Sequence, residues 1–208
     1  ETEKQWKNAF LELLRKLRFE IENSNKEIFW FTSTKPQQGK TTLIQALSYI
    51  LWLGKKKVLI IDTNFCDNEL TKSGNALPVL EKFELNGRPF NMEDLKDLIT
   101  PTAVHGIDIV GCQGGDYTPT EILPKNHLLN YLSQITGLYD YVFLEGASLN
   151  EFSDTKELLP YADGLIAVFS SESDFTAADK ESVRFLVENK SKFLGAILNK
   201  VANNNLEL

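Results

Sequence analysis

The sequence predicts an α/β fold with a mostly parallel, doubly wound sheet, preceded by one amphipathic helix. Short apolar runs rich in β-branched and aromatic residues alternate along the chain with segments of helical periodicity. The runs are continuously apolar rather than alternating in polarity, which is typical of strands covered on both faces. Strand–helix alternation of this kind indicates right-handed crossovers within a parallel sheet.

The elements of the alternating region follow one another closely. The expected strands are 27–32, 57–62, 107–110, 139–145, 164–170 and 193–199. The expected helices are 41–53, 92–99, 124–135, 155–161 and 177–189. Asn91 with Asp94, and Asp174 ahead of Ala177, have the character of helix starts. The segment 65–88 is the least regular, and we expect it to be a surface excursion.

The N-terminal segment differs from the rest, because 3–21 has the periodicity of one long amphipathic helix. Its apolar stripe consists of Trp6, Phe10, Leu13, Leu14, Leu17 and Ile21. We expect a single nucleotide-binding domain over 1–208, with an assembly helix in 1–24 and the α/β core in 25–208.

The composition narrows the class of protein. A chain of 208 residues with 42% hydrophobic and 25% charged residues fits one globular domain with a sizeable core. The formal net charge of −7 argues against a nucleic-acid partner. Cys66 and Cys112 lack the spacing of metal ligands or of a disulfide framework, so we expect buried thiols. No apolar run has the length of a membrane span.

The segment FTSTKPQQGKTT has the layout of a phosphate-binding loop, with a strand before it and a helix after it. Lys40 is placed to reach the β- and γ-phosphates of a nucleotide, and the Thr41 hydroxyl is placed to bind Mg²⁺. The full pattern G-x-x-x-x-G-K-[ST] asks for glycine at the position of Thr34, where threonine restricts the loop without abolishing it. The alternative is a chance G-K-T in a turn. The residues expected to contact the nucleotide are Lys35, Pro36, Gln37, Gln38, Gly39, Lys40, Thr41 and Thr42. We call 34–41 the phosphate loop, and it predicts a three-layer sandwich like that of the P-loop NTPases.

Two carboxylates are expected beside this loop. Asp62 ends the strand KKKVLIID, and Glu145 ends the strand YDYVFLE. Ligands of such folds lie at the carboxyl ends of the strands, so both residues are candidate Mg²⁺ ligands, and Asp62 is also a candidate catalytic base. The alternative for Asp62 is the cap of a turn or helix.

Several segments, in this order and spacing, are similar to the motifs of one family. They are ELLRKLRFEI, TSTKPQQGKTT, VLIIDTNF, YTPTEIL, YDYVFLEGAS and the pair ADGLIAVFSS and FLGAILNKV. The chain resembles the bacterial tyrosine kinases (BY-kinases), the cytoplasmic ATPase-like domains attached to polysaccharide co-polymerases. The resemblance covers nearly the whole chain. The deviant Walker ATPases of chromosome partitioning and division-site placement are looser relatives, and Lys35 stands where they carry their signature lysine.

The resemblance implies ATP or ADP with Mg²⁺ as cofactors, and a place at the cytoplasmic face of a bacterial inner membrane. It implies ring-like assembly of copies through Glu12, Arg15 and Arg18, which match an E-x-x-R-x-x-R motif. The alternative for that motif is an intrahelical Glu12–Arg15 pair on a solvated face. The resemblance also implies a membrane co-polymerase segment as partner. It implies that Asn199 contacts the nucleotide base, and the alternative for Asn199 is a cap at the end of its strand.

The chain departs from the family pattern where the metal is held. The second carboxylate of the D-x-D-x-R motif is Asn64, its arginine is Cys66, and the usual aspartate of the Walker B strand is Glu145. In the phosphate loop, Gln37 stands where the family has a glycine. The family phosphorylates a C-terminal tyrosine cluster, whereas the last tyrosine of this chain is Tyr161. We therefore expect nucleotide binding to be better preserved than phosphoryl transfer. The favoured function is a degenerate assembly domain that regulates polysaccharide export. The alternatives are an active tyrosine autokinase and a partition-type ATPase.

Overall fold

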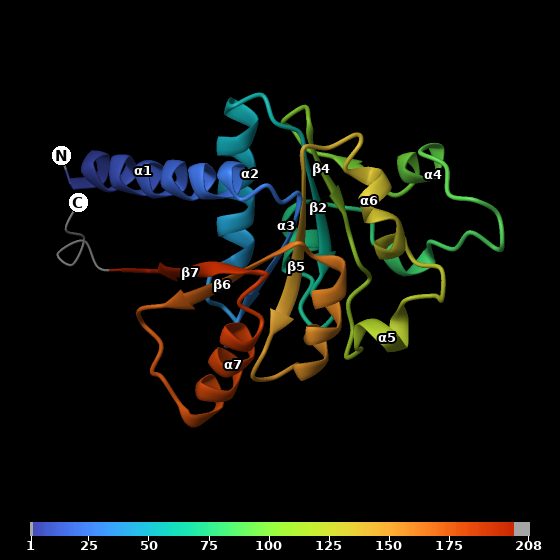
Figure 1. The fold of residues 1–208 in the computed structure, drawn as a ribbon. Helices are drawn as coiled ribbons and strands as arrows, with labels where there is room; N and C mark the ends of the chain where they lie inside the picture. Colours follow the sequence, from blue (N-terminus) through green and yellow to red (C-terminus); the bar gives the residue numbers. More distant parts are fainter. Residues whose placement is uncertain (1, 202–208) are drawn as a thin grey trace.

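The structure of the chain, a computed structural model, describes the backbone of residues 2–201 and the side chains from residue 10 onward (Figure 1). Within this part, a seven-stranded sheet has the order β3-β4-β2-β5-β1-β6-β7. The parallel strands are β1 (Ile28–Ser33), β2 (Val58–Thr63), β4 (Ile107–Val110), β5 (Tyr141–Ser148), β6 (Gly164–Ser170) and β7 (Phe193–Asn199). The short β3 (Thr100–Pro101) pairs antiparallel with β4. The predicted fold class is confirmed, and β3 is a strand that the sequence pattern did not reveal.

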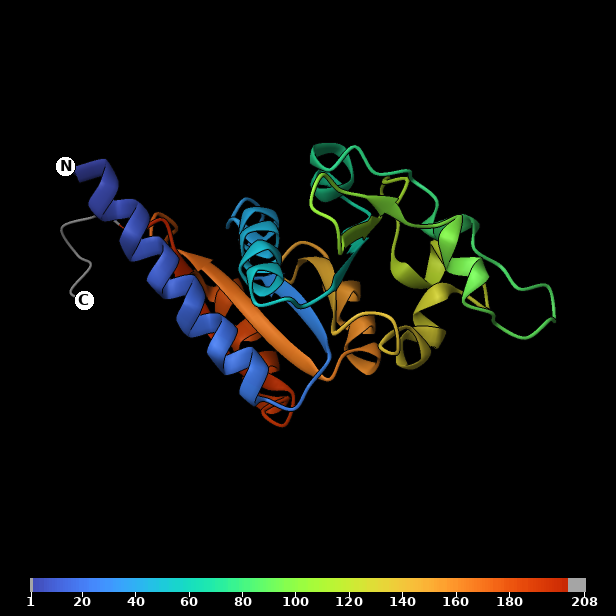
Figure 2. The ribbon, with the colours of Figure 1, turned by 90° about the horizontal axis from the view of Figure 1, so that it is seen from above.

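Helices cover both faces of the sheet. The α-helices are α1 (Thr2–Asn23), α2 (Lys40–Leu53), α3 (Glu69–Ser73), α4 (Glu93–Lys96), α5 (Pro119–Ile122), α6 (Leu132–Ile135) and α7 (Ala177–Glu188). The 3₁₀ helices are η1 (Leu80–Lys82), η2 (Leu128–Tyr131) and η3 (Ser153–Tyr161). Figure 2 shows α1 alongside β6 and β7, with the segments between β2 and β5 at the other end of the sheet.

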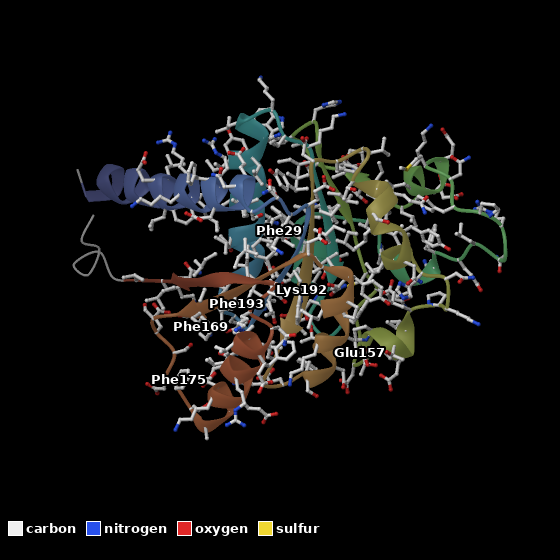
Figure 3. The ribbon with its side chains drawn as sticks, viewed as in Figure 1. Phe29, Glu157, Phe169, Phe175, Lys192 and Phe193 are labelled. Carbon is white, nitrogen blue, oxygen red and sulfur yellow. The ribbon has the colours of Figure 1, made fainter. Side chains whose placement is uncertain are left out.

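The core forms two layers because alternate residues of each buried strand face opposite sides of the sheet. Phe29 and Phe31 of β1 pack with α1 and α2, while Trp30 between them packs with the helices of the other face. Figure 3 labels Phe29 in this core and Phe175 on the loop between β6 and α7, where Phe175 is 61% exposed. The strands are continuously apolar because both faces of the sheet are covered.

Helix α1 packs through part of its predicted stripe. Leu14 and Ile21 are buried, and Leu17 packs partly against the same core. Leu13 was expected in the stripe but is 41% exposed, because it lies on the flank turned away from α2 and the sheet. The side chain of Trp6 lies outside the described residues.

Two of the predicted helices are interrupted. The expected helix 124–135 is replaced by η2 and α6, which together begin at Leu128. The preceding α5 was not predicted from the sequence; Thr118 and Glu121 form the capping box at its start, and it ends at Leu123, which is extended as the following Pro124 requires. The expected helix 155–161 is a 3₁₀ helix that contains Pro160.

Two of the predicted helix starts also differ in detail. The expected helix 92–99 is reduced to the four residues of α4, although Asn91 accepts a hydrogen bond from the Glu93 N–H and donates its own N–H to Asp94. Helix α7 begins after Thr176, which forms a capping box with Asp179, and not after Asp174.

The packing of α1 leads to a stability prediction. Ile21→Ala should lower the free energy of unfolding by about 2–5 kcal/mol, because Ile21 is fully buried and its removal leaves a cavity. Leu13→Ala is the matched control and should change it by no more than about 0.5 kcal/mol. Urea unfolding of the two variants measures the difference, and equal losses would contradict the placement of the helix.

Candidate nucleotide-binding site

The phosphate loop connects the end of β1 to the first turn of α2. Gly39 precedes α2 with a φ of 91°, and a Cβ there would lie 2.1 Å from Asn199 Nδ2, so glycine is required. Gln37 also has a positive φ, of 57°, which costs a residue with a side chain about 1–2 kcal/mol. The family's glycine at this position is therefore absent while the left-handed turn is retained.

Side chains of the loop and its neighbours hold this turn in place. Gln38 is buried; its Oε1 accepts from Ser170 N at 2.6 Å, and its Nε2 donates to Ser173 Oγ at 2.9 Å. Asn199 Nδ2 donates to the backbone oxygen of Gln38 at 3.0 Å. The loop is thus fixed to the ends of β6 and β7 without a ligand, so little ordering entropy remains to be lost on binding.

Asn199 was predicted as a contact to a nucleotide base, but its side chain already bonds within the protein. Its Oδ1 accepts from Lys200 N at 2.9 Å, so the side chain caps the end of β7 while it covers Gly39. The geometry is that of the strand-end cap, and a contact with a nucleotide base stays a prediction.

Lys40 carries a positive charge into the protein. Its side chain is buried, and Nζ donates to Ser33 Oγ at 3.0 Å. Burial lowers the pKa of Lys40, and the negative charges of Glu145 and Asp67 oppose that shift. The ammonium group is therefore held beside the loop by one neutral hydroxyl and by nearby carboxylates, and it lacks a close ion-pair partner among the described residues.

Glu145 lies on the opposite side of the first turn of α2. Its Oε1 accepts from Thr41 Oγ1 at 2.6 Å, while its Oε2 is buried without a hydrogen-bond partner among the described residues. Burial raises the pKa of Glu145 to about 7, aided by repulsion from Asp62 and opposed by Lys40. A buried carboxylate oxygen with a free lone pair, next to a threonine hydroxyl, fits a Mg²⁺ ion or a water bound to one.

Asp62 is the register partner of Glu145 in the sheet, but unlike Glu145 it accepts hydrogen bonds at both carboxylate oxygens. Its Oδ1 accepts from Asn64 N at 3.1 Å, and its Oδ2 accepts from Thr71 N at 2.9 Å and Thr71 Oγ1 at 2.6 Å. Burial raises the pKa of Asp62 to about 6, although the hydrogen bonds from Thr71 and Asn64 lower it. These are the contacts of a cap that ties β2 to α3. Its role as base or metal ligand stays a prediction.

A cavity of about 390 Å³ opens in front of the loop. It is lined by residues 36–42 together with Asn64 and Glu145, which the sequence had singled out. Five further residues line the cavity that were not predicted as site residues from the sequence: Asp67, Glu69, Ser148, Phe152 and Lys200. Asp67 and Glu69 belong to the irregular segment after β2, where no periodicity indicated that the chain turns back toward the loop.

Lys35 does not line this cavity. Its Nζ is 3.2 Å from Asp179 Oδ2 and also donates to the backbone oxygen of Asp174. The signature-lysine position is therefore tied to the start of α7 within the same chain. Among the described residues, no group of three or more His, Cys, Asp or Glu is placed to hold a metal ion.

The expected assembly motif faces partly toward its own domain. Arg15 pairs with Glu12 on an exposed face, which is the intrahelical alternative. Arg18 Nε is 3.7 Å from Glu22 Oε2, and Arg18 Nη1 lies near Gly54 at the end of α2. A contact of this motif with another copy stays a prediction.

The fold and the phosphate loop are those of a P-loop NTPase-like protein, and solved structures agree. The chimerical protein CapA2B2 aligns with a TM-score of 0.78 at 21% identity, over 92% of this chain and 85% of that one. The septum site-determining protein MinD of Pyrococcus horikoshii, complexed with Mg-ADP, aligns with a TM-score of 0.57 at 18% identity, over 87% and 74%. These likenesses establish the fold.

The sequence relatives include bacterial tyrosine-protein kinases and a polysaccharide transport protein, which confirms the resemblance seen in the motifs. The tyrosine-protein kinase CpsD of Streptococcus agalactiae serotype Ia is 26% identical over 92% of this chain and 82% of its own length. The tyrosine-protein kinase ptk of Acinetobacter johnsonii is 28% identical over 75% of this chain, but the match spans 20% of ptk. The succinoglycan biosynthesis transport protein ExoP of Rhizobium meliloti is 26% identical over 89% of this chain and 24% of its own length.

Two further observations complete the comparison. No family model matches the sequence. In the described part of the chain, none of the helices combines the length and the hydropathy needed to cross a bilayer.

The raised pKa of Glu145 predicts a pH-dependent stability. The stabilisation from its protonated form is complete below its usual value of 4.5 and is lost as the pH rises through about 7. Glu145→Gln remains neutral throughout. The difference in unfolding free energy between Glu145→Gln and the unmodified protein should therefore change by about 2 kcal/mol from about pH 5 to about pH 8, in favour of the variant.

Urea unfolding of the nucleotide-free protein at the two pH values measures this gain. Glu84→Gln, at an exposed position, is the control and should show no such trend. A Glu145→Gln effect that is the same at both pH values would contradict the burial of this carboxylate.

Proposed function

We propose that this chain is an ATP-binding domain of the BY-kinase type that regulates capsular or exopolysaccharide polymerisation and export, with weak or absent tyrosine phosphorylation. One observation carries the proposal. The phosphate loop is already formed, with Lys40 at its base and the Thr41–Glu145 pair beside it. The kinase names of the sequence relatives support the activity class, and the Mg-ADP complex of the MinD neighbour supports the cofactors.

Different residues would bind the phosphates, the metal ion and the attacking hydroxyl. The N–H groups at the start of α2 and the Lys40 ammonium bind the β- and γ-phosphates. The Thr41 hydroxyl and Glu145 would hold Mg²⁺, directly or through water, and the ion would neutralise charge on the phosphate oxygens. Asp62 would accept the proton of an attacking hydroxyl, and its pKa of about 6 suits a base near neutral pH.

The same geometry supports weak turnover. Asn64 adds no charge, and its Oδ1 already accepts from Asp67 N at 3.3 Å. Both oxygens of Asp62 accept from protein donors, so releasing one for a metal or a proton costs a buried hydrogen bond. Displacing one group of such a phosphate site costs on the order of 10²-fold in rate.

The alternatives have unequal support. An active tyrosine autokinase is the second candidate, because Asp62 near the end of β2 and Lys40 at the start of α2 are the two residues that this activity would use. A partition-type ATPase has less support, because Lys35 is ion-paired with Asp179 of its own chain. The proposed partners are ATP, further copies through α1 and a membrane co-polymerase segment at the cytoplasmic face of the inner membrane, without nucleic acid.

The first prediction of this function concerns binding. The chain should bind ADP and ATP in the presence of Mg²⁺, and Lys40→Ala should abolish binding because the phosphates lose their buried cation. Lys96→Ala, on exposed α4, is the matched control and should bind as the unmodified chain does. Isothermal titration calorimetry measures both, and the absence of heat with either nucleotide at millimolar concentration would refute the proposal.

The second prediction concerns turnover. The unmodified chain should hydrolyse ATP and phosphorylate tyrosine far more slowly than the roughly 1–100 s⁻¹ of kinases. Asn64→Asp combined with Glu145→Asp should raise the rate, because it restores the family's carboxylates. Transfer of labelled phosphate measures this, and kinase-like rates for the unmodified chain would favour the active autokinase.

A further inference from the structure

Ser148 is an unpartnered polar group in the wall of the candidate nucleotide site. It is the last residue of β5 and is 3% exposed. Its Oγ has no hydrogen-bond partner among the described residues, although the side chain lines the cavity in front of the phosphate loop. Buried hydroxyl groups are nearly always hydrogen-bonded, so the Ser148 hydroxyl is available to a group that enters this cavity.

The position of Ser148 specifies which part of the ligand it meets. In the sheet, Ser148 is the register partner of Ser33, whose Oγ accepts from Lys40 Nζ at 3.0 Å. Ser148 thus lies on the strand beside the group that holds the phosphate-binding ammonium. Lysines in such loops reach the β- and γ-phosphates, while the loop N–H groups surround the α- and β-phosphates. A γ-phosphate bound by Lys40 in this way would lie next to Ser33 and its strand neighbour Ser148.

The backbone around Ser148 is held firmly. Its carbonyl oxygen accepts from Phe152 N at 3.0 Å, and the next residue, Leu149, donates its N–H to Ser33 O at 2.8 Å. The backbone that carries the hydroxyl is therefore fixed, and rotation about χ1 is enough to direct the hydroxyl to a ligand. A donor fixed in this way contributes more to binding than a mobile side chain, because less conformational entropy is lost.

We propose that the Ser148 hydroxyl donates a hydrogen bond to the γ-phosphate of a bound nucleoside triphosphate and so favours ATP over ADP. This inference rests on the proposed nucleotide site. The hydroxyl is neutral, so it would add no repulsion to phosphate oxygens in a cavity that Glu145 and Asp67 also line. It is a donor to the terminal phosphate in a chain whose metal site has an amide, Asn64, in place of a carboxylate.

Calorimetric titration with Mg²⁺ and either ADP or the non-hydrolysable analogue AMP-PNP tests the proposal. Ser148→Ala should weaken AMP-PNP binding about tenfold, because a hydrogen bond to a charged acceptor is lost. Its affinity for ADP should be unchanged, which also shows that the variant is folded. Thr155→Val is the matched control, since Thr155 Oγ1 is likewise buried and unpartnered but faces the neighbouring cavity; both nucleotides should bind it normally.

Three outcomes would overturn the inference. Unchanged AMP-PNP affinity in Ser148→Ala, with ADP binding intact, refutes the contact alone and leaves the proposed function standing. Equal losses for the two nucleotides would show that Ser148 supports the loop as a whole and not the γ-phosphate. The absence of binding by the unmodified chain would refute the proposed function and this inference together.

Discussion

The burial of the Lys40 ammonium at the carboxyl end of the sheet is the constraint on which the rest of the site depends. A buried cation is costly unless hydrogen bonds and opposite charges stabilise it. Here Ser33 supplies the hydrogen bond, while Glu145, Asp67 and Asp62 supply negative potential. Glu145 and Asp62 in turn have raised pKa values, because burial disfavours their charged forms, and repulsion from Asp62 adds to the shift of Glu145. A phosphate and its metal ion would complete this balance, which gives the loop a physical reason to bind a nucleotide.

The phosphate loop achieves by side-chain contacts what glycines achieve in the full pattern. Gln38 and Asn199 fix it to β6 and β7, and Gln37 adopts a left-handed conformation that the missing glycine would adopt without strain. Binding is therefore organised by many contacts, none of which depends on the family's second carboxylate. The proposed phosphoryl transfer would depend on few groups, and two of them, Asn64 and Glu145, are altered. This difference supports the proposal that nucleotide binding is better preserved than phosphoryl transfer.

Much of this arrangement was readable from the sequence. Buried parallel strands produce continuous apolar runs, so six strands and helices α1, α2 and α7 were predicted close to their observed bounds. The loop followed from its local motif. Glu145 was expected to end its strand, but β5 continues to Ser148 because the chain beyond the carboxylate still pairs with β1. Short elements were not predicted because one helical turn has no detectable periodicity.

Other features depend on contacts between segments distant in the chain. The capture of Asp62 by Thr71, and the placement of Asp67 and Ser148 in the cavity wall, arise only when the chain folds. The inward turn of Arg18 toward Gly54 is of the same kind, since its helical position alone fits both faces.

A crystal structure of the chain with Mg²⁺ and ADP tests the central claim most directly. The account predicts the β-phosphate within hydrogen-bond distance of the N–H groups of Gly39, Lys40 and Thr41, with Lys40 Nζ moved from Ser33 to phosphate oxygen. It also predicts the metal ion, or a water bound to it, at Glu145 Oε2. Nucleotide bound elsewhere, or Lys40 still on Ser33 with the loop unoccupied at saturating ADP, would contradict it.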